Sequence, residues 1–130
     1  MRYALLIYSV PPEAEPSPEA QKAEMQRYNA FTREVNERGL YKGGEALEAA
    51  NTATTVRVRN GKTLTTDGPF AETKEEFGGF YLIDAPDLDV AIEMAAKIPA
   101  VERGAIEIRP VWELPGEYSM AVAGASDARG

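Results

Sequence analysis

The 130-residue sequence contains no cysteine and no histidine. Without cysteine the chain can form no disulfide, no thiolate nucleophile and no thiolate metal site. Without histidine it lacks the usual general base near neutral pH and the commonest metal ligand. A zinc site built from carboxylates alone would be unusual, and no segment has the spacing of an EF-hand. We therefore expect no metal site and no cofactor.

Positive charge and long apolar runs are also scarce. There are 14 Lys and Arg residues against 21 Asp and Glu residues, which gives a formal charge of −7. Because an acidic surface repels phosphate backbones, we predict no nucleic-acid binding. The opening run MRYALLIYSV is too short to span a bilayer, and no A-x-A-like cleavage site follows it. These features favour a cytoplasmic protein without membrane association.

The residues that are present suit one globular domain, with 44% hydrophobic and 27% charged residues. The segment RYALLIYSV (2–10) predicts a central strand, and the four prolines of PPEAEPSP predict a loop. Ser17 is a good N-cap, Pro18 suits the first helical position and Gly39 supplies a stop. These signals predict a helix over residues 18–38, with Met25, Tyr28, Phe31 and Val35 on a buried stripe.

The second half of the chain alternates strands with a turn and one helix. LYKGGEALE (40–48) predicts a weaker strand, and Asn60-Gly61 is a strong hairpin turn between Val56-Val58 and the threonines that follow. Further patterns predict a strand at 78–85 and a last strand at 105–114 that includes Trp112. They also predict a helix at 88–98 whose apolar face consists of Leu88, Ala91, Ile92, Ala95 and Ile98.

The resulting order of strand, helix, strand, hairpin, strand, helix and strand predicts an α+β fold. We expect a ferredoxin-like sandwich with an inserted β-hairpin, in which two helices cover one face of a mostly antiparallel sheet. Both faces of the first strand are apolar, so we infer a homodimer in which two sheets pack face to face. Residues 1–114 form the predicted domain, and residues 115–130 form either a C-terminal tail or an arm that lies across the partner.

Several segments together resemble a known family. DGPFAETKEEFGGFYLIDAPDLDVAIEMAAKIP, followed by GAIEIRPVWE, resembles the branch of the YCII-related domain family named for its DGPF motif. MRYALLIYS and MQRYNAFTREV are also similar to that branch, and the likeness covers about residues 1–113. The resemblance implies a ferredoxin-like fold that pairs as a dimeric α+β barrel. It also suggests a regulatory role, because many genes of the branch lie beside sigma-factor genes.

Some relatives in that family carry a His–Asp pair suggested to be catalytic. The histidine lies on the first helix, where this chain has Gln26, Arg27 and Tyr28. The aspartate precedes the proline after the second helix, where this chain has Ile98. The acid/base chemistry suggested for those relatives therefore does not carry over to this sequence.

The DGPF stretch supplies most of the candidate site residues. Asp67 is either a general base or ligand-orienting carboxylate, or the acceptor of an Asx-type turn. Phe70 is a core or interface plug, or a platform for a substrate. Glu72 belongs to a charge run that either is solvated or supplies a carboxylate for acid/base chemistry. Gly78-Gly79 predicts a bulge or a close backbone approach.

Two further candidates lie outside that stretch. Arg109 could hold a carboxylate ligand, or it could pair with Glu45 or Glu107. The hydroxyls of Tyr28 and Tyr81 could bind a ligand, although a phenol at the edge of a core is the more common arrangement. The ligand-binding candidates are thus Tyr28, Asp67, Phe70, Glu72 and Arg109, and the sequence identifies no catalytic residue.

Two functions compete on this evidence. The first is a non-catalytic homodimeric module that binds a small molecule or a protein. The second is a small-molecule lyase or isomerase that uses carboxylate and tyrosine groups in a cleft near the DGPF loop. The second requires at least two of Asp67, Glu72, Tyr28 and Arg109 to meet in one cavity.

Overall fold

The fold is known from a computed structural model that describes residues 1–117. Its elements follow the predicted order, with two short 3₁₀ helices added. The predicted tail or arm at 115–130 lies mainly outside the described residues. The elements are β1 (Arg2–Ser9), α1 (Pro18–Glu37), β2 (Tyr41–Ala46), η1 (Ala50–Thr52), β3 (Thr54–Arg59), β4 (Lys62–Asp67), β5 (Glu76–Asp84), α2 (Leu88–Ala95), η2 (Pro99–Glu102) and β6 (Gly104–Pro110).

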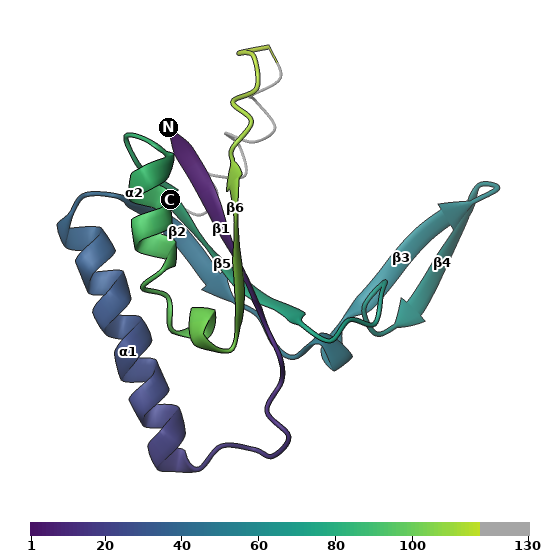
Figure 1. The fold of residues 1–130 in the computed structure, drawn as a ribbon. Helices are drawn as coiled ribbons and strands as arrows, with labels where there is room; N and C mark the ends of the chain where they lie inside the picture. Colours follow the sequence, from purple (N-terminus) through teal and green to yellow (C-terminus); the bar gives the residue numbers. More distant parts are fainter. Residues whose placement is uncertain (118–130) are drawn as a thin grey trace.

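Four strands form the main sheet in the order β2-β5-β1-β6, and β3 and β4 form a separate two-stranded sheet. All neighbouring strands of the main sheet run antiparallel. Helices α1 and α2 lie on the same side of this sheet, as Figure 1 shows. The predicted ferredoxin-like α+β arrangement with an inserted hairpin is therefore confirmed.

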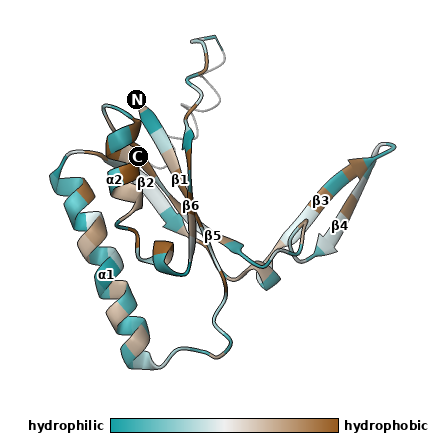
Figure 2. Cartoon of the chain, viewed as in Figure 1, coloured by the Kyte–Doolittle hydropathy of each residue, from teal (hydrophilic) through white to brown (hydrophobic). Residues whose placement is uncertain are grey.

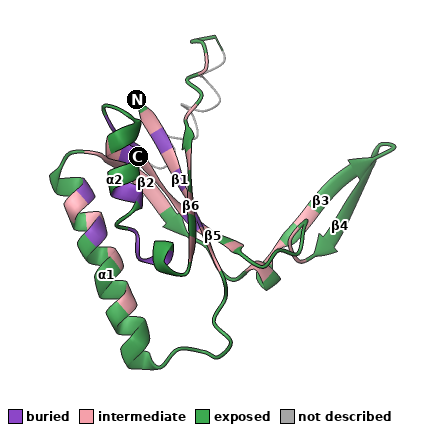
Figure 3. Cartoon of the chain, in the orientation of Figure 1, coloured by how far each residue is buried: buried purple, intermediate pink, exposed green. Residues whose placement is uncertain are grey.

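The core fills the layer between the helices and the sheet. From β1, Tyr3, Leu5 and Ile7 point into it, and their neighbours in the register on β5 include Ile83. The buried residues cluster where β1 and β5 pass beneath the helices (Figure 3). Leu5, Ile83, Met94, Ile98 and Val35 are the largest side chains that are fully buried.

Helix α1 begins as predicted, because the Ser17 hydroxyl accepts a hydrogen bond of 3.1 Å from the backbone N–H of Ala20. Only part of the predicted stripe is buried. Phe31 and Val35 are in the core, but Met25 is 65% exposed. The reason is that the N-terminal turns of α1 extend beyond the sheet (Figure 1).

Helix α2 is shorter than the predicted range of 88–98, since it ends at Ala95. Ile98 precedes Pro99 and is extended, with ψ of 126°, because a proline disfavours the helical conformation of the residue before it. Of the five residues predicted for the apolar face, Ala91, Ala95 and Ile98 are buried as predicted, and the other two are not. Met94 is fully buried, whereas Leu88 and Ile92 are about half exposed.

The last strand is also shorter than predicted, ending at Pro110 rather than Leu114. Proline has no N–H to continue the ladder, and only the Val111 N–H extends it, donating to the Arg2 carbonyl at 2.9 Å. Trp112 consequently lies outside the strand and is 79% exposed.

The face of the sheet opposite the helices carries an apolar strip that we call the open face. The register pairs Ala4 with Leu82, Leu6 with Phe80 and Tyr8 with Phe77. These side chains point away from the core side because Leu5 and Ile7 alternate with them. No described helix covers this face (Figure 1). The strip consists of Leu6, Tyr8, Phe77, Phe80 and Leu82.

Strands β3 and β4 form a hairpin that we call the arm (residues 54–67). Asn60 and Gly61 make its turn with φ of 52° and 74°, which confirms the predicted hairpin. The arm projects away from the main sheet (Figure 1), and apolar residues remain along it (Figure 2). Val56 is 60% exposed and Val58 is 58% exposed.

None of the helices within residues 1–117 combines the length and the apolar composition that a membrane span requires.

Candidate functional site

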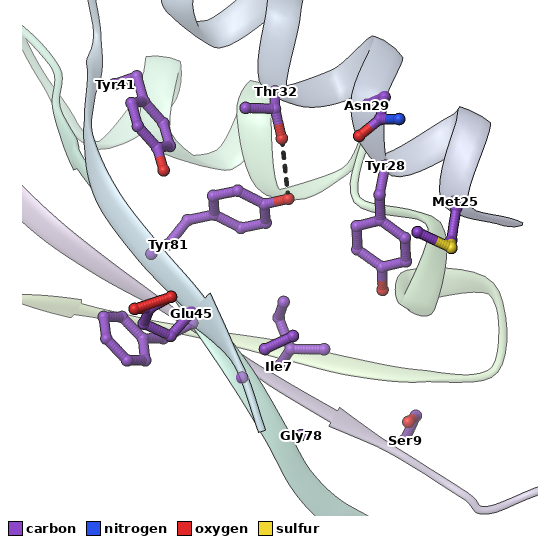
Figure 4. Close-up of a pocket in the computed structure, with 14 residues that line it drawn as sticks. Ile7, Ser9, Met25, Tyr28, Asn29, Thr32, Tyr41, Glu45, Gly78 and Tyr81 are labelled. Carbon is purple, nitrogen blue, oxygen red and sulfur yellow. Dashed lines mark hydrogen bonds between the residues drawn. The ribbon is translucent and has the colours of Figure 1, made fainter. Parts of the chain in front are cut away.

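A cavity of about 420 Å³ opens between the middle of α1 and the sheet. We call it the α1 pocket. Helix α1 contributes Met25, Tyr28, Asn29 and Thr32, and the strands contribute the floor (Figure 4). The pocket lies where the helix extends past the buried core. Its walls therefore consist mainly of aromatic rings and polar groups, and contain few of the aliphatic side chains that fill the core.

The polar groups of the α1 pocket come mainly from hydroxyls. Thr32 and Tyr81 share a hydrogen bond of 3.1 Å between their hydroxyl oxygens, and the phenol of Tyr28 lies beside them (Figure 4). Burial raises the pKa of the Tyr28 phenol, with a further contribution from Glu24. Burial also raises the pKa of the Tyr81 phenol. Both phenols are therefore neutral donors and acceptors at physiological pH.

Glu45 is the one acidic or basic residue that lines the α1 pocket. The register pairs Glu45 with Phe80 and pairs Gly44 with Tyr81. Since Tyr81 points toward α1, the side chain of Glu45 leaves from the opposite face of the sheet (Figure 4). The interior of the α1 pocket thus presents neutral polar groups and no full charge.

Two glycines in the floor of the α1 pocket let β2 and β5 lie close together. A Cβ on Gly79 would lie 2.6 Å from the Glu45 carbonyl oxygen, and a Cβ on Gly44 would lie 2.6 Å from that of Phe80. The β1–β5 register also shifts beside Gly78, between Ile7 and Tyr8. The predicted bulge and close backbone approach at Gly78-Gly79 are both confirmed, and the approaching backbone is that of β2.

A second cavity of about 650 Å³ lies at the base of the arm. We call it the loop cleft. Its apolar wall includes Phe70, Leu47 and the rings of Tyr8 and Phe77, whose centroids are 5.4 Å apart. Its charged residues are all acidic: Glu48, Glu72 and Glu76. Two of the sequence candidates, Phe70 and Glu72, therefore meet in this cleft.

Asp67 ends β4 and pairs with Thr54 in the register. Within residues 1–117 its carboxylate accepts no hydrogen bond, so an Asx-type turn does not form there. Hydrogen bonds of the backbone hold the turn that follows β4 instead. The Gly68 N–H donates to the Ala53 carbonyl at 2.7 Å, and the Thr55 hydroxyl donates to the Gly68 carbonyl at 2.8 Å. Gly68 has φ of 100°, a conformation that favours glycine.

Arg109 lies on β6, where it pairs with Ala4 and therefore points to the open face. Its guanidinium donates to Glu107 at 3.2 Å, one of the two protein partners considered for it. Tyr28 lines the α1 pocket, Glu72 lines the loop cleft, and Asp67 lines neither. These four candidates are therefore not brought together in one cavity.

Two polar residues that α1 contributes to the pocket were missed by the sequence reasoning. Asn29 and Thr32 lie one and four positions after Tyr28, so Tyr28 and Thr32 share one face of the helix. That spacing was the available signal. Their partner Tyr81 is 49 residues from Thr32 in the sequence, and only the fold brings the two hydroxyls together.

No group of three or more Asp or Glu side chains within residues 1–117 is arranged to hold a metal ion. The carboxylates of the loop cleft therefore line its wall but are not arranged as a metal-binding site.

The fold and its cavities define a class: a small ferredoxin-like α+β domain with a neutral pocket under its first helix. Comparison with known proteins places it more narrowly. The model of the YCII-related domain matches residues 1–115. The chain is also similar to a protein of Rhizobium meliloti (strain 1021), "Uncharacterized protein R00369", with 36% identity over 114 residues, covering 85% of this chain and 92% of that protein. The chain belongs to the YCII-related domain family.

Proposed function

We propose that this chain is a non-catalytic homodimeric module that binds an uncharged small molecule in the α1 pocket. The observation that carries the proposal is the combination of a 420 Å³ cavity with neutral hydroxyl groups and aromatic rings. Cavities of this size suit small ligands, which a few placed polar groups orient within mostly apolar walls.

None of the lining residues directs an acidic or basic side chain into the α1 pocket, and this supports an uncharged ligand. A buried ion requires a paired charge or several hydrogen bonds, and otherwise its desolvation is not offset. Glu45 is the only acidic or basic residue of the lining, and it belongs to the opposite face. A carboxylate or phosphate in the α1 pocket would meet only neutral donors, namely hydroxyls and the Asn29 amide, and no cation. A neutral ligand with ring and hydroxyl or carbonyl groups fits these walls better.

The separation of the candidate residues supports binding over catalysis. A lyase or isomerase would need an acid and a base near the same bound molecule. Asp67, Glu72, Tyr28 and Arg109 instead lie at four different places, and the half-buried phenols of Tyr28 and Tyr81 have raised pKa values, so both stay protonated near pH 7.

The open face supports the homodimer. Leu6, Phe80 and Leu82 form its apolar centre, and the ion-paired Arg109 and Glu107 lie beside it on β6. A two-layer α/β sandwich leaves one sheet face uncovered, and a second copy can cover an apolar one through an isologous contact.

Filling the α1 pocket should abolish ligand binding without unfolding the protein. Asn29 lines the pocket and Ala30 does not, and both are exposed on α1. We expect Asn29→Trp to block the pocket, because the indole is much larger than the amide. The measurement is a thermal-shift screen of uncharged aromatic and hydroxylated metabolites, with benzamide and benzoate as a matched neutral and anionic pair. A ligand at 100 times its Kd stabilises the folded state by about 2.7 kcal/mol.

The matched control for this screen is Ala30→Trp, which places the same indole one residue away. Compounds that stabilise the wild type and Ala30→Trp, but not Asn29→Trp, would support the proposal. Compounds that stabilise all three proteins equally would place the binding site elsewhere. A broad library without any stabilising compound would favour a protein partner instead.

A further inference from the structure

The arm is amphipathic and carries a net positive charge, whereas the chain as a whole is acidic. Within residues 54–67 there are three basic side chains, Arg57, Arg59 and Lys62, and one acidic side chain, Asp67. The whole chain carries a formal charge of −7. The register places Val56 and Val58 opposite Thr65 and Thr63 on one face, while Arg57 and Arg59 alternate with them.

The arm is a two-stranded ribbon that projects into solvent in the isolated chain (Figure 1). An isolated two-stranded hairpin is marginally stable in water. The exposed Val56, Val58 and Leu64 are also uncovered apolar side chains. Both features indicate that the arm packs against another surface in the working form of the protein.

The charges of the arm and of the loop cleft have no ion-pair partners within residues 1–117. Several basic groups elsewhere are paired: Arg38 contacts Glu93 at 2.8 Å and Arg27 contacts Glu102 at 2.8 Å. No such contact reaches Arg57 or Lys62, or the carboxylates of Glu48, Glu72 and Glu76. The cationic ribbon and the acidic cleft are therefore complementary surfaces without partners.

The arm cannot place its distal cations in the loop cleft of its own chain. The cleft is lined by Thr54 and Thr55 at the base of the arm. At about 3.3 Å per residue of strand, Arg57 lies roughly 7 Å and Arg59 roughly 13 Å farther out than Thr55. The strand is extended, so the arm points these charges away from its own cleft and toward another molecule.

We propose that the arm docks into the loop cleft of a second copy of this chain, with Arg57 and its neighbours against the glutamates and Val56 and Val58 against the apolar wall of Phe70 and Leu47. This inference rests on the proposed homodimer and adds a reciprocal contact to it. The arm and the cleft meet at Thr54 and Thr55, so they lie on the same side of the molecule. In an isologous dimer each arm would therefore cover the partner's cleft, and neither cleft is complete without the second copy.

Charge exchange tests this contact. We expect Arg57→Glu to weaken dimerisation about tenfold or more, because close interfacial charge pairs couple strongly. The double variant Arg57→Glu/Glu72→Lys should recover much of the lost affinity. The control Arg33→Glu makes the same change in net charge at an exposed position of α1 and should leave the dimer unchanged. Sedimentation equilibrium at low and high salt measures all four proteins, including the wild type.

A second measurement keeps the test independent of charge. The chain has no cysteine, so Val58→Cys and Phe70→Cys can be introduced in separate chains of distinguishable mass. Mixing them should give a heterodimeric disulfide, whereas Ala30→Cys mixed with Phe70→Cys should not. A wild-type dimer that is indifferent to Arg57→Glu and forms no such cross-link would overturn the arm contact and leave the dimer intact. A monomeric wild type would overturn both.

Discussion

Gly104→Val is expected to destabilise the fold by about 3 kcal/mol or more, the upper range for overpacking in a rigid core. A Cβ at Gly104 would lie 2.0 Å from the carbonyl oxygen of Tyr8 and 2.7 Å from the Cα of Ser9. Both are backbone atoms of β1, so no side-chain rotation can relieve the contact. Strands β1 and β6 would have to separate at the point where Ser9 pairs with Gly104. The measurement is urea unfolding followed by circular dichroism.

The matched control is Gly78→Ala in the same sheet, where an added Cβ meets no atom within 4 Å. We expect a loss of less than about 1 kcal/mol there, the usual cost of a tolerated substitution. If the urea unfolding curves of the two variants had equal midpoints and equal slopes, β1 and β6 would not approach as closely as described.

Leu5→Ala is expected to cost about 2–5 kcal/mol, the range observed when a fully buried leucine is truncated. Leu5 is 0% exposed at the centre of β1, between β5 and β6 and beneath the helices. Its neighbours cannot collapse into the vacated space, because backbone pairing holds β1 on both sides. A loss of this size is a large part of the stability of a small domain.

Leu88→Ala removes the same atoms at an exposed site and serves as the comparison. Leu88 is the first residue of α2 and is about half exposed, and alanine is a good helix former. We expect a change within about 0.5 kcal/mol. If the two variants had similar midpoints in urea unfolding, the core would not be centred on β1.

The features predicted correctly from the sequence are those that local chemistry determines. Asn60-Gly61 adopts the left-handed conformations that a tight hairpin requires, and few other dipeptides do so readily. Ser17 caps α1 through its own hydroxyl three residues from the bonded N–H. The order of strands and helices then limits the ways in which their apolar faces can be buried, and this accounts for the success of the fold prediction.

The features that were missed depend on contacts between distant segments. Met25 has the helical spacing of a core residue, yet α1 extends past the sheet there and leaves it exposed. Asp67 precedes a glycine, which is typical of a turn, but its carboxylate takes no part in the turn after β4. The Gly68 N–H and the Thr55 hydroxyl stabilise that turn instead. Pro110 stopped the last strand before Trp112, although the alternating pattern continued through it.

The candidate site was predicted only in part for the same reason. Tyr28 was identified because its hydroxyl is visible in the sequence as a polar group on an apolar helix face. Its companions Thr32 and Tyr81 come together only because β5 lies between β1 and β2 in the sheet. No local sequence pattern specifies that strand order. The DGPF stretch contributes Phe70 and Glu72 to a different cavity, the loop cleft.

The working form that we propose is a homodimer formed by two open faces, so its mass in solution is the most direct test. Light scattering during size-exclusion chromatography at micromolar concentration should give twice the monomer mass of 14.2 kDa. Leu6→Glu, which places a carboxylate at the centre of the open face, should give a folded protein of monomer mass. A wild-type protein that elutes at 14.2 kDa under these conditions would contradict the proposed dimer.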